Sequence, residues 1–125
     1  MQKPALCRAL AQNLAVLQDR FGGSDDFYTK KLSMGGIRCA IIMFTGISSP
    51  EKLCRLALDM LDRDPAFFGG GPGLCNYLLK QSLIPAEPQP ASDIEEIGEL
   101  LANGMSLLLI DDCDQAVVFS TQEMP

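Results

Sequence analysis

The sequence contains no histidine, no tryptophan and, beyond Lys80, no basic residue. Without histidine, every mechanism that relies on an imidazole is excluded, including the Ser-His-Asp and Cys-His nucleophile pairs and histidine-containing zinc sites. The P-loop and dinucleotide-binding glycine patterns are also missing. We therefore expect a protein that is not an enzyme, with no catalytic residues, no metal site and no cofactor.

The five cysteines include no CxxC pair, and their number is odd. This usage predicts reduced, mostly buried thiols in a cytosolic compartment. No apolar stretch approaches the ~20 residues of a membrane span, and no charged segment followed by an apolar run marks a signal peptide at the start. The cysteines are Cys7, Cys39, Cys54, Cys75 and Cys113.

Length and charge set further bounds. A chain of 125 residues with 47% hydrophobic content predicts one soluble domain, residues 1–125, with a real core. The net charge is −6, and residues 81–125 hold nine acids and no base. An acidic total disfavours a nucleic-acid partner. The acidic second half suits either a basic partner or a merely solvated surface, which is the commoner outcome.

The first half of the chain predicts a helix followed by a hairpin. Apolar residues recur at spacings of four and three over 4–20, which is typical of an amphipathic helix, and Gly22-Gly23 ends it. Two strands are expected at 27–33 and 37–44, joined at Gly35-Gly36, where glycine tolerates the positive φ of a tight turn. The run "CAIIMF" is apolar on both faces, so the second strand is expected to be central.

Three more helices and a second hairpin follow. Helices are expected at 49–62, where Ser49 precedes Pro50, at 74–83, and from Ser92, whose capping box includes Glu95. The glycine-rich stretch 69–73 is interpreted as a mobile connector and 85–92 as a proline-rich one. Strands are expected at 107–110 and 116–119. The fold class is thus α/β (α+β), a mixed sheet built from two hairpins and flanked by amphipathic helices.

The stretch "DDCD" between the last two strands carries Asp111, Asp112, Cys113 and Asp114. Clustered carboxylates bind hard cations, but the calcium-loop spacing is absent. Aspartate also stabilises tight turns, and apolar strands on both sides favour this interpretation. An acidic tip that faces a partner, and a carboxylate-dependent enzyme, remain the alternatives. Cys113 at such a tip is expected to react first with an alkylating probe.

Lys30, Lys31 and Arg38 surround the first hairpin. They suit a basic patch for an acidic partner or for phospholipid head groups. Two or three bases near a turn are more often simply solvated.

Two segments resemble the N-terminal domain of the A subunit of GerA-type spore germinant receptors. They are "IMFTGI" at 42–47 and "IEEIGELLANGMSLLLIDDCDQAVVFST" at 94–121, which are similar to the family's "YIDGL"-like segment and its "NGxxxLLIDGxxxAxxxST" pattern. Two positions depart from the family: Thr45 stands where an aspartate is common, and Asp112 where glycine follows "LLID". These departures affect any expectation that a specific ligand is shared.

The resemblance implies a non-catalytic interaction and signal-relay subdomain of a germinant receptor. It implies a position on the cytoplasmic face of the spore inner membrane, a membrane region downstream of this chain, and B-type and C-type subunits or a second copy as partners. Asp111, Asp112 and Asp114 are the candidate partner-facing residues. The alternative is a nutrient-binding subdomain of the same receptor or of a related sporulation membrane protein, with the strand end at Thr45, Gly46, Ser48 and Ser49 as ligand site.

Overall fold

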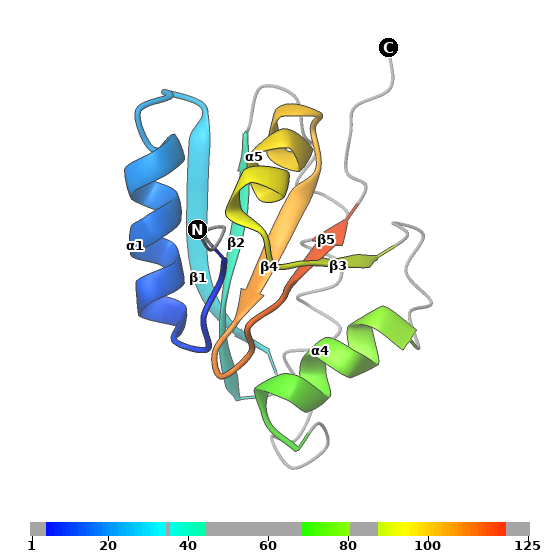
Figure 1. The fold of residues 1–125 in the computed structure, drawn as a ribbon. Helices are drawn as coiled ribbons and strands as arrows, with labels where there is room; N and C mark the ends of the chain where they lie inside the picture. Colours follow the sequence, from blue (N-terminus) through cyan, green and yellow to red (C-terminus); the bar gives the residue numbers. More distant parts are fainter. Residues whose placement is uncertain (1–4, 35, 45–68, 81–87, 120–125) are drawn as a thin grey trace.

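The structure is a computed structural model, and it describes residues 5–34, 36–44, 69–80 and 88–119. Within these residues, no helix combines the length and apolar character that crossing a membrane requires. These described residues form three helices and five strands (Figure 1). In chain order they are α1 (Leu10–Phe21), β1 (Phe27–Met34), β2 (Ile37–Phe44), α4 (Gly71–Lys80), β3 (Gln89–Ala91), α5 (Ile94–Ala102), β4 (Ser106–Ile110) and β5 (Ala116–Phe119).

The five strands form one sheet in the order β1-β2-β4-β5-β3. All four pairings are antiparallel. The two hairpins meet where β2 pairs with β4, with Cys39 opposite Ile110 and Ile42 opposite Leu107. The predicted α+β fold with two hairpins in one sheet is confirmed, but the sheet is antiparallel rather than mixed, because β3 joins the edge as an antiparallel strand.

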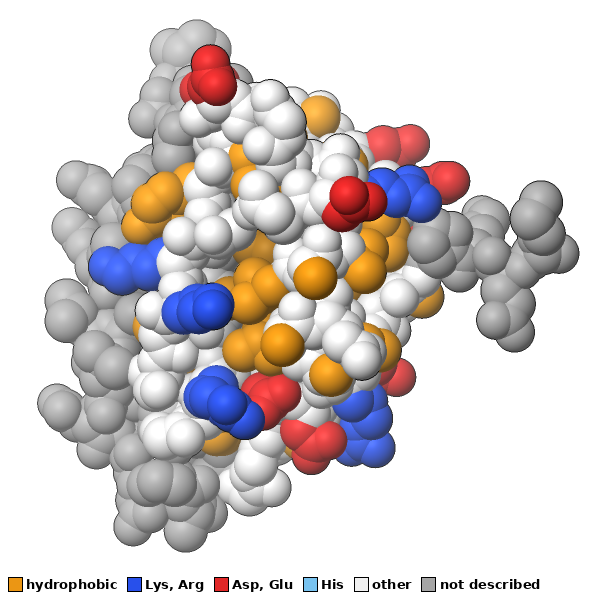
Figure 2. Space-filling model, turned by 90° about the vertical axis from the view of Figure 1, so that its left-hand side faces the viewer, with side chains coloured by type: hydrophobic (Ala, Val, Ile, Leu, Met, Phe, Trp, Pro, Cys, Tyr) orange, Lys and Arg blue, Asp and Glu red, His pale blue; other side chains and the backbone are white. Residues whose placement is uncertain are grey.

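Side chains that alternate along each strand divide the core into two layers. In β2, Cys39, Ile41 and Met43 pack on the side of α4. Ala40 and Ile42 pack on the side of α1 and α5. Helices therefore cover both faces of the sheet, with α1 and α5 together on one face (Figure 1). On the side of the molecule where α1 and β1 lie, apolar side chains gather between flanking Lys and Arg side chains (Figure 2).

Helix α1 begins at Leu10, so the predicted start at residue 4 is wrong. The backbone N–H of Cys7 donates to Asn13 Oδ1 at 2.8 Å, and Asn13 Nδ2 donates to the carbonyl of Cys7 at 2.8 Å. These two bonds turn the chain away from the helix axis. Leu6 lies in an extended segment instead of the helix, and its side chain is buried. Its backbone N–H donates to the carbonyl of Ser92 at 2.8 Å.

Glycine and proline positions also differ from expectation. Gly71–Gly73 is the first turn of α4 rather than a connector. Gly71 lies so close to the tip of the second hairpin that a Cβ there would collide with the carbonyl oxygen of Asp111. Part of the predicted connector 85–92 is strand β3, which pairs with β5 through Pro90 opposite Val117. Proline is tolerated there because β3 is an edge strand.

Helix α5 is capped one residue later than predicted. Asp93, not Ser92, is the N-cap, and its carboxylate accepts from the N–H of Glu95 at 3.2 Å. The predicted helix at 49–62 and the predicted helix end at 81–83 lie outside the described residues.

Candidate functional site

The acidic stretch 111–115 forms the turn between β4 and β5, so the turn interpretation is confirmed. Asp112 has a φ of 64°, and it is the only non-glycine residue with positive φ among those described. Aspartate enters this left-handed region more readily than most residues, although glycine enters it at no steric cost. This explains how aspartate can occupy a position where the similar receptor pattern has glycine.

Asp111 connects the turn to α1 and β2. Its Oδ1 accepts from the N–H of Leu10 at 3.2 Å, and its Oδ2 accepts from Arg38 Nη2 at 3.1 Å. The N-cap residue of α1 is Ala9, which makes no side-chain cap. Asp111 therefore supplies the missing cap from the turn that follows β4, and its negative charge suits the positive end of the helix.

Asp112 connects the same turn to the segment before α1. Its N–H donates to the carbonyl of Arg8 at 2.8 Å, and its Oδ1 lies 3.3 Å from Arg8 Nε. Both side chains are about two-thirds exposed, at 65% and 66%, so the ion pair contributes little to stability. The backbone bond is the stronger constraint on the turn.

The candidate site residues fall into two groups in the structure. Asp111 and Asp112 make the intramolecular contacts above, whereas Asp114 is exposed and has no ion pair within the described ranges. A partner-facing role for the three stays a prediction. Thr45, Gly46, Ser48 and Ser49 lie outside the described residues.

Cys113 is buried, with 8% of its surface exposed, which argues against the expectation that it reacts first with an alkylating probe. It packs in the α4-side core together with Cys75. Burial raises the pKa of the Cys75 thiol to about 12, and a hydrogen bond with Cys113 adds to the shift. Burial likewise raises the pKa of Cys39 to about 12. These thiols stay protonated near neutral pH, which makes Cys39 and Cys75 poor nucleophiles.

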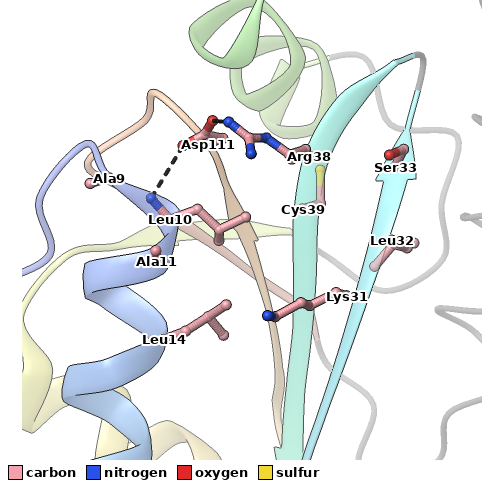
Figure 3. Close-up of a pocket in the computed structure, with 10 residues that line it drawn as sticks. All are labelled: Ala9, Leu10, Ala11, Leu14, Lys31, Leu32, Ser33, Arg38, Cys39 and Asp111. Carbon is pink, nitrogen blue, oxygen red and sulfur yellow. Dashed lines mark hydrogen bonds and ion pairs between the residues drawn. The ribbon is translucent and has the colours of Figure 1, made fainter.

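A cavity of about 590 Å³ lies between α1 and the β1–β2 hairpin. Figure 3 shows Leu10 and Leu14 pointing from α1 toward the sheet, while Lys31 reaches across β2 toward Leu14. Arg38 and Asp111 meet at one end (Figure 3). We call this space the α1–β1 cavity. It is lined by Ala9, Leu10, Ala11, Leu14, Lys31, Leu32, Ser33, Arg38, Cys39 and Asp111.

A second cavity, also of about 590 Å³, lies between α4 and the β4–β5 turn. Arg8, Asn76, Asp112 and Asp114 are among its lining residues. Across the part of the chain that the structure describes, no three Cys, Asp or Glu side chains converge in a way that could hold a metal ion.

The sequence could show only part of the α1–β1 cavity. Side chains alternate along β1, so Lys31 and Ser33 lie on the same face of the sheet. Once the hairpin register is known, Arg38 joins them there, because it lies opposite Ser33. The contribution of Leu10, and its contact with Asp111, could not be read in this way, because the two residues are 101 positions apart.

Comparison with known proteins gives one informative result. No protein-family model matches the sequence, and no curated protein matches it. A solved structure does match: the N-terminal domain of the A subunit of the Bacillus megaterium spore germinant receptor GerK3, with a TM-score of 0.77 and 19% sequence identity. The match covers 99% of this chain and 50% of that one. The chain therefore shares the fold of this receptor domain and spans half its length.

Proposed function

We propose that this chain is the first subdomain of the soluble N-terminal part of a spore germinant receptor A subunit, where it acts as a non-catalytic interaction and signal-relay module. The structural match over 99% of the chain is the observation that carries the proposal. The two sequence segments at 42–47 and 94–121 support it independently, because they resemble the same domain. The solved neighbour is a domain of a spore germinant receptor subunit.

The proposed location is the cytoplasmic face of the spore inner membrane, as part of a longer chain whose membrane region follows this subdomain. Cys7, Cys39, Cys75 and Cys113, the cysteines within the described residues, are free thiols, which supports a cytoplasmic side. Sequencing the full gene tests this location directly: a full-length product with no transmembrane segment after residue 125 contradicts it.

The proposed partners are the B-type and C-type receptor subunits, or a second copy of the chain, and the β4–β5 turn is the proposed contact. Arg38 pairs with Asp111 and Arg8 with Asp112, whereas Asp114 has no ion pair with any residue that the structure describes. A basic partner group would meet Asp114 first. A partner bound at the turn would then act on α1 through Asp111, and on the segment before α1 through Asp112.

The test is a germination assay on spores that carry the full-length gene. An Asp114→Lys variant should slow the response to nutrients, because it reverses the charge presented to the partner, while the amount of receptor in the membrane stays unchanged. Lys80→Glu, a charge reversal at the end of α4 away from the turn, is the matched control. Normal germination in the Asp114 variant contradicts the contact at the turn.

A nutrient-binding subdomain is the second candidate, and the presence of a cavity of suitable size favours it. The residues expected to bind the nutrient, Thr45, Gly46, Ser48 and Ser49, lie outside the described part of the chain. Thermal unfolding of the longer N-terminal domain should show ~2.7 kcal/mol of stabilisation for a nutrient at 100 times its Kd. If no nutrient that germinates the spores shifts the unfolding transition, this candidate is rejected.

A further inference from the structure

We propose that the α1–β1 cavity binds a small organic monoanion, a carboxylate with an apolar body. This proposal does not depend on the receptor role, since it rests on the shape, apolar walls and charge of the cavity alone.

The charges of the cavity select the sign of the ligand. Three charged side chains line it, and two of them, Arg38 and Asp111, are paired at 3.1 Å. Lys31 makes no ion pair with any described residue. One positive charge is left over, so the lining is complementary to a single negative charge.

Lys31 is exposed, but its side chain borders the cavity. Figure 3 shows it extending over β2 on the side of Leu14, and both residues line the space. The neighbouring Lys30 is also exposed, but alternation along β1 puts it on the opposite face of the sheet, opposite Ile41. The two lysines therefore differ in surroundings although they are adjacent in the sequence.

The opposite wall of the cavity is apolar. Leu10 is buried, Leu14 is half-buried, and both side chains point into the space between α1 and the sheet (Figure 3). Ala11 leaves room between them because its side chain is a single methyl group. An apolar ligand body on this wall would exclude water from Lys31, which strengthens the attraction between the ammonium group and a carboxylate.

The size of the space fits this class of ligand. Small-molecule sites commonly enclose ~300–1,000 Å³ and combine apolar walls with a few polar groups. The α1–β1 cavity, at about 590 Å³, has apolar residues on α1 and polar or charged residues on β1, β2 and the β4–β5 turn. The arrangement suits a chain or ring that lies along α1 with its carboxylate at Lys31.

The test uses sodium octanoate, an apolar chain with one carboxylate, at concentrations below micelle formation. The ¹⁵N-labelled 125-residue chain is titrated and followed by NMR. We expect saturable shifts at the amides of Ala11, Leu14 and Lys31. Octanol, which lacks the charge, and octylammonium, which reverses it, should bind about fivefold more weakly, since an ion pair to an exposed lysine contributes up to ~1 kcal/mol.

Two variants locate the site. Lys31→Gln should weaken octanoate binding about fivefold or more, because it removes the uncompensated charge while leaving an exposed side chain that does not disturb folding. Lys30→Gln is the matched control and should leave the affinity unchanged. Ala11→Leu fills the space beside Leu14 and should abolish the saturable shifts.

Three outcomes would overturn the proposal. The first is equal binding of octanoate and octanol, which would show that the charge plays no part. The second is an equal loss in the Lys30 and Lys31 variants, which would indicate a diffuse charge effect. The third is a set of shifts confined to residues outside the cavity.

Discussion

The two hairpins of the sheet differ in how much of each is buried. In β1 the central residues Tyr28 to Lys31 are exposed, whereas every residue of β4 and β5 is buried. The turn of the second hairpin is also held from outside itself, by Leu10, Arg38 and Arg8. The second hairpin is thus the anchor of the fold, and the first provides the surface on which the α1–β1 cavity is built.

The largest difference between the hairpins should appear when a core leucine is truncated. Leu108 in β4 is fully buried, and Leu32 in β1 is half-buried on the same face of the sheet. We expect Leu108→Ala to cost ~3–4 kcal/mol, because it leaves a cavity as well as losing apolar burial, and Leu32→Ala to cost ~1 kcal/mol. Urea denaturation measures both, and equal losses would show that the second hairpin is not the anchor.

The contact between α4 and the second turn should be the next most sensitive point. Gly71→Ala places a Cβ against the carbonyl oxygen of Asp111, so either α4 or the turn must shift. We expect a loss of ~2–3 kcal/mol, as in other overpacked sites. Gly23→Ala is the control, since a Cβ there meets nothing within 4 Å. Thermal unfolding of the two variants should differ, and a Gly71→Ala protein as stable as the control would contradict the close contact.

The cap that the second hairpin gives to α1 should have a smaller effect. Asp111→Ala removes both the bond from Leu10 and the pair with Arg38, for an expected loss of ~1–2 kcal/mol. Asp111→Asn keeps an oxygen for the Leu10 N–H, so it should lose less than 1 kcal/mol, roughly the value of an exposed ion pair. If the asparagine variant loses as much as the alanine variant, the ion pair and not the cap is what matters.

The smallest effect concerns thiol reactivity and needs no change in sequence. Cys7 is half-buried in the segment before α1, whereas Cys39, Cys75 and Cys113 are buried. Alkylation followed by peptide mass spectrometry at neutral pH should label Cys7 about tenfold faster than these three, because its thiol is more accessible to the reagent. Faster labelling of Cys113 would show that the second turn opens more readily than its contacts indicate.

The sequence predicted the strands better than the helix starts. The bounds of β2 and β5 match the prediction, because apolar runs flanked by glycine or by acidic residues leave few alternatives. Leu6 fitted the helical spacing of α1 by coincidence and belongs to an extended segment. Ser92 and Asp93 are both good caps, so a pattern search could not separate them. β3 was missed because proline argues against a strand except at an edge.

The contacts of the acidic turn could not be predicted from the sequence, for a different reason from the missed strand and helix starts. Arg38 and Asp111 are 73 positions apart, and no local pattern links them. The identity of the turn was predictable from its flanking strands. Its role as the cap of α1 depends on the tertiary fold that brings β4 beside β2.

The pairing of β2 with β4 also constrains when the protein can fold. On the ribosome, β2 is made long before its inner neighbour β4. Cys39 cannot pair until Ile110 has been synthesised, and Ile42 cannot pair until Leu107 has been. Until then the first hairpin has one unpaired apolar edge, a form that favours aggregation. Contacts so distant in the chain slow folding. Synthesis truncated before residue 106 should therefore yield an insoluble product, even though most of the helical sequence would already be present.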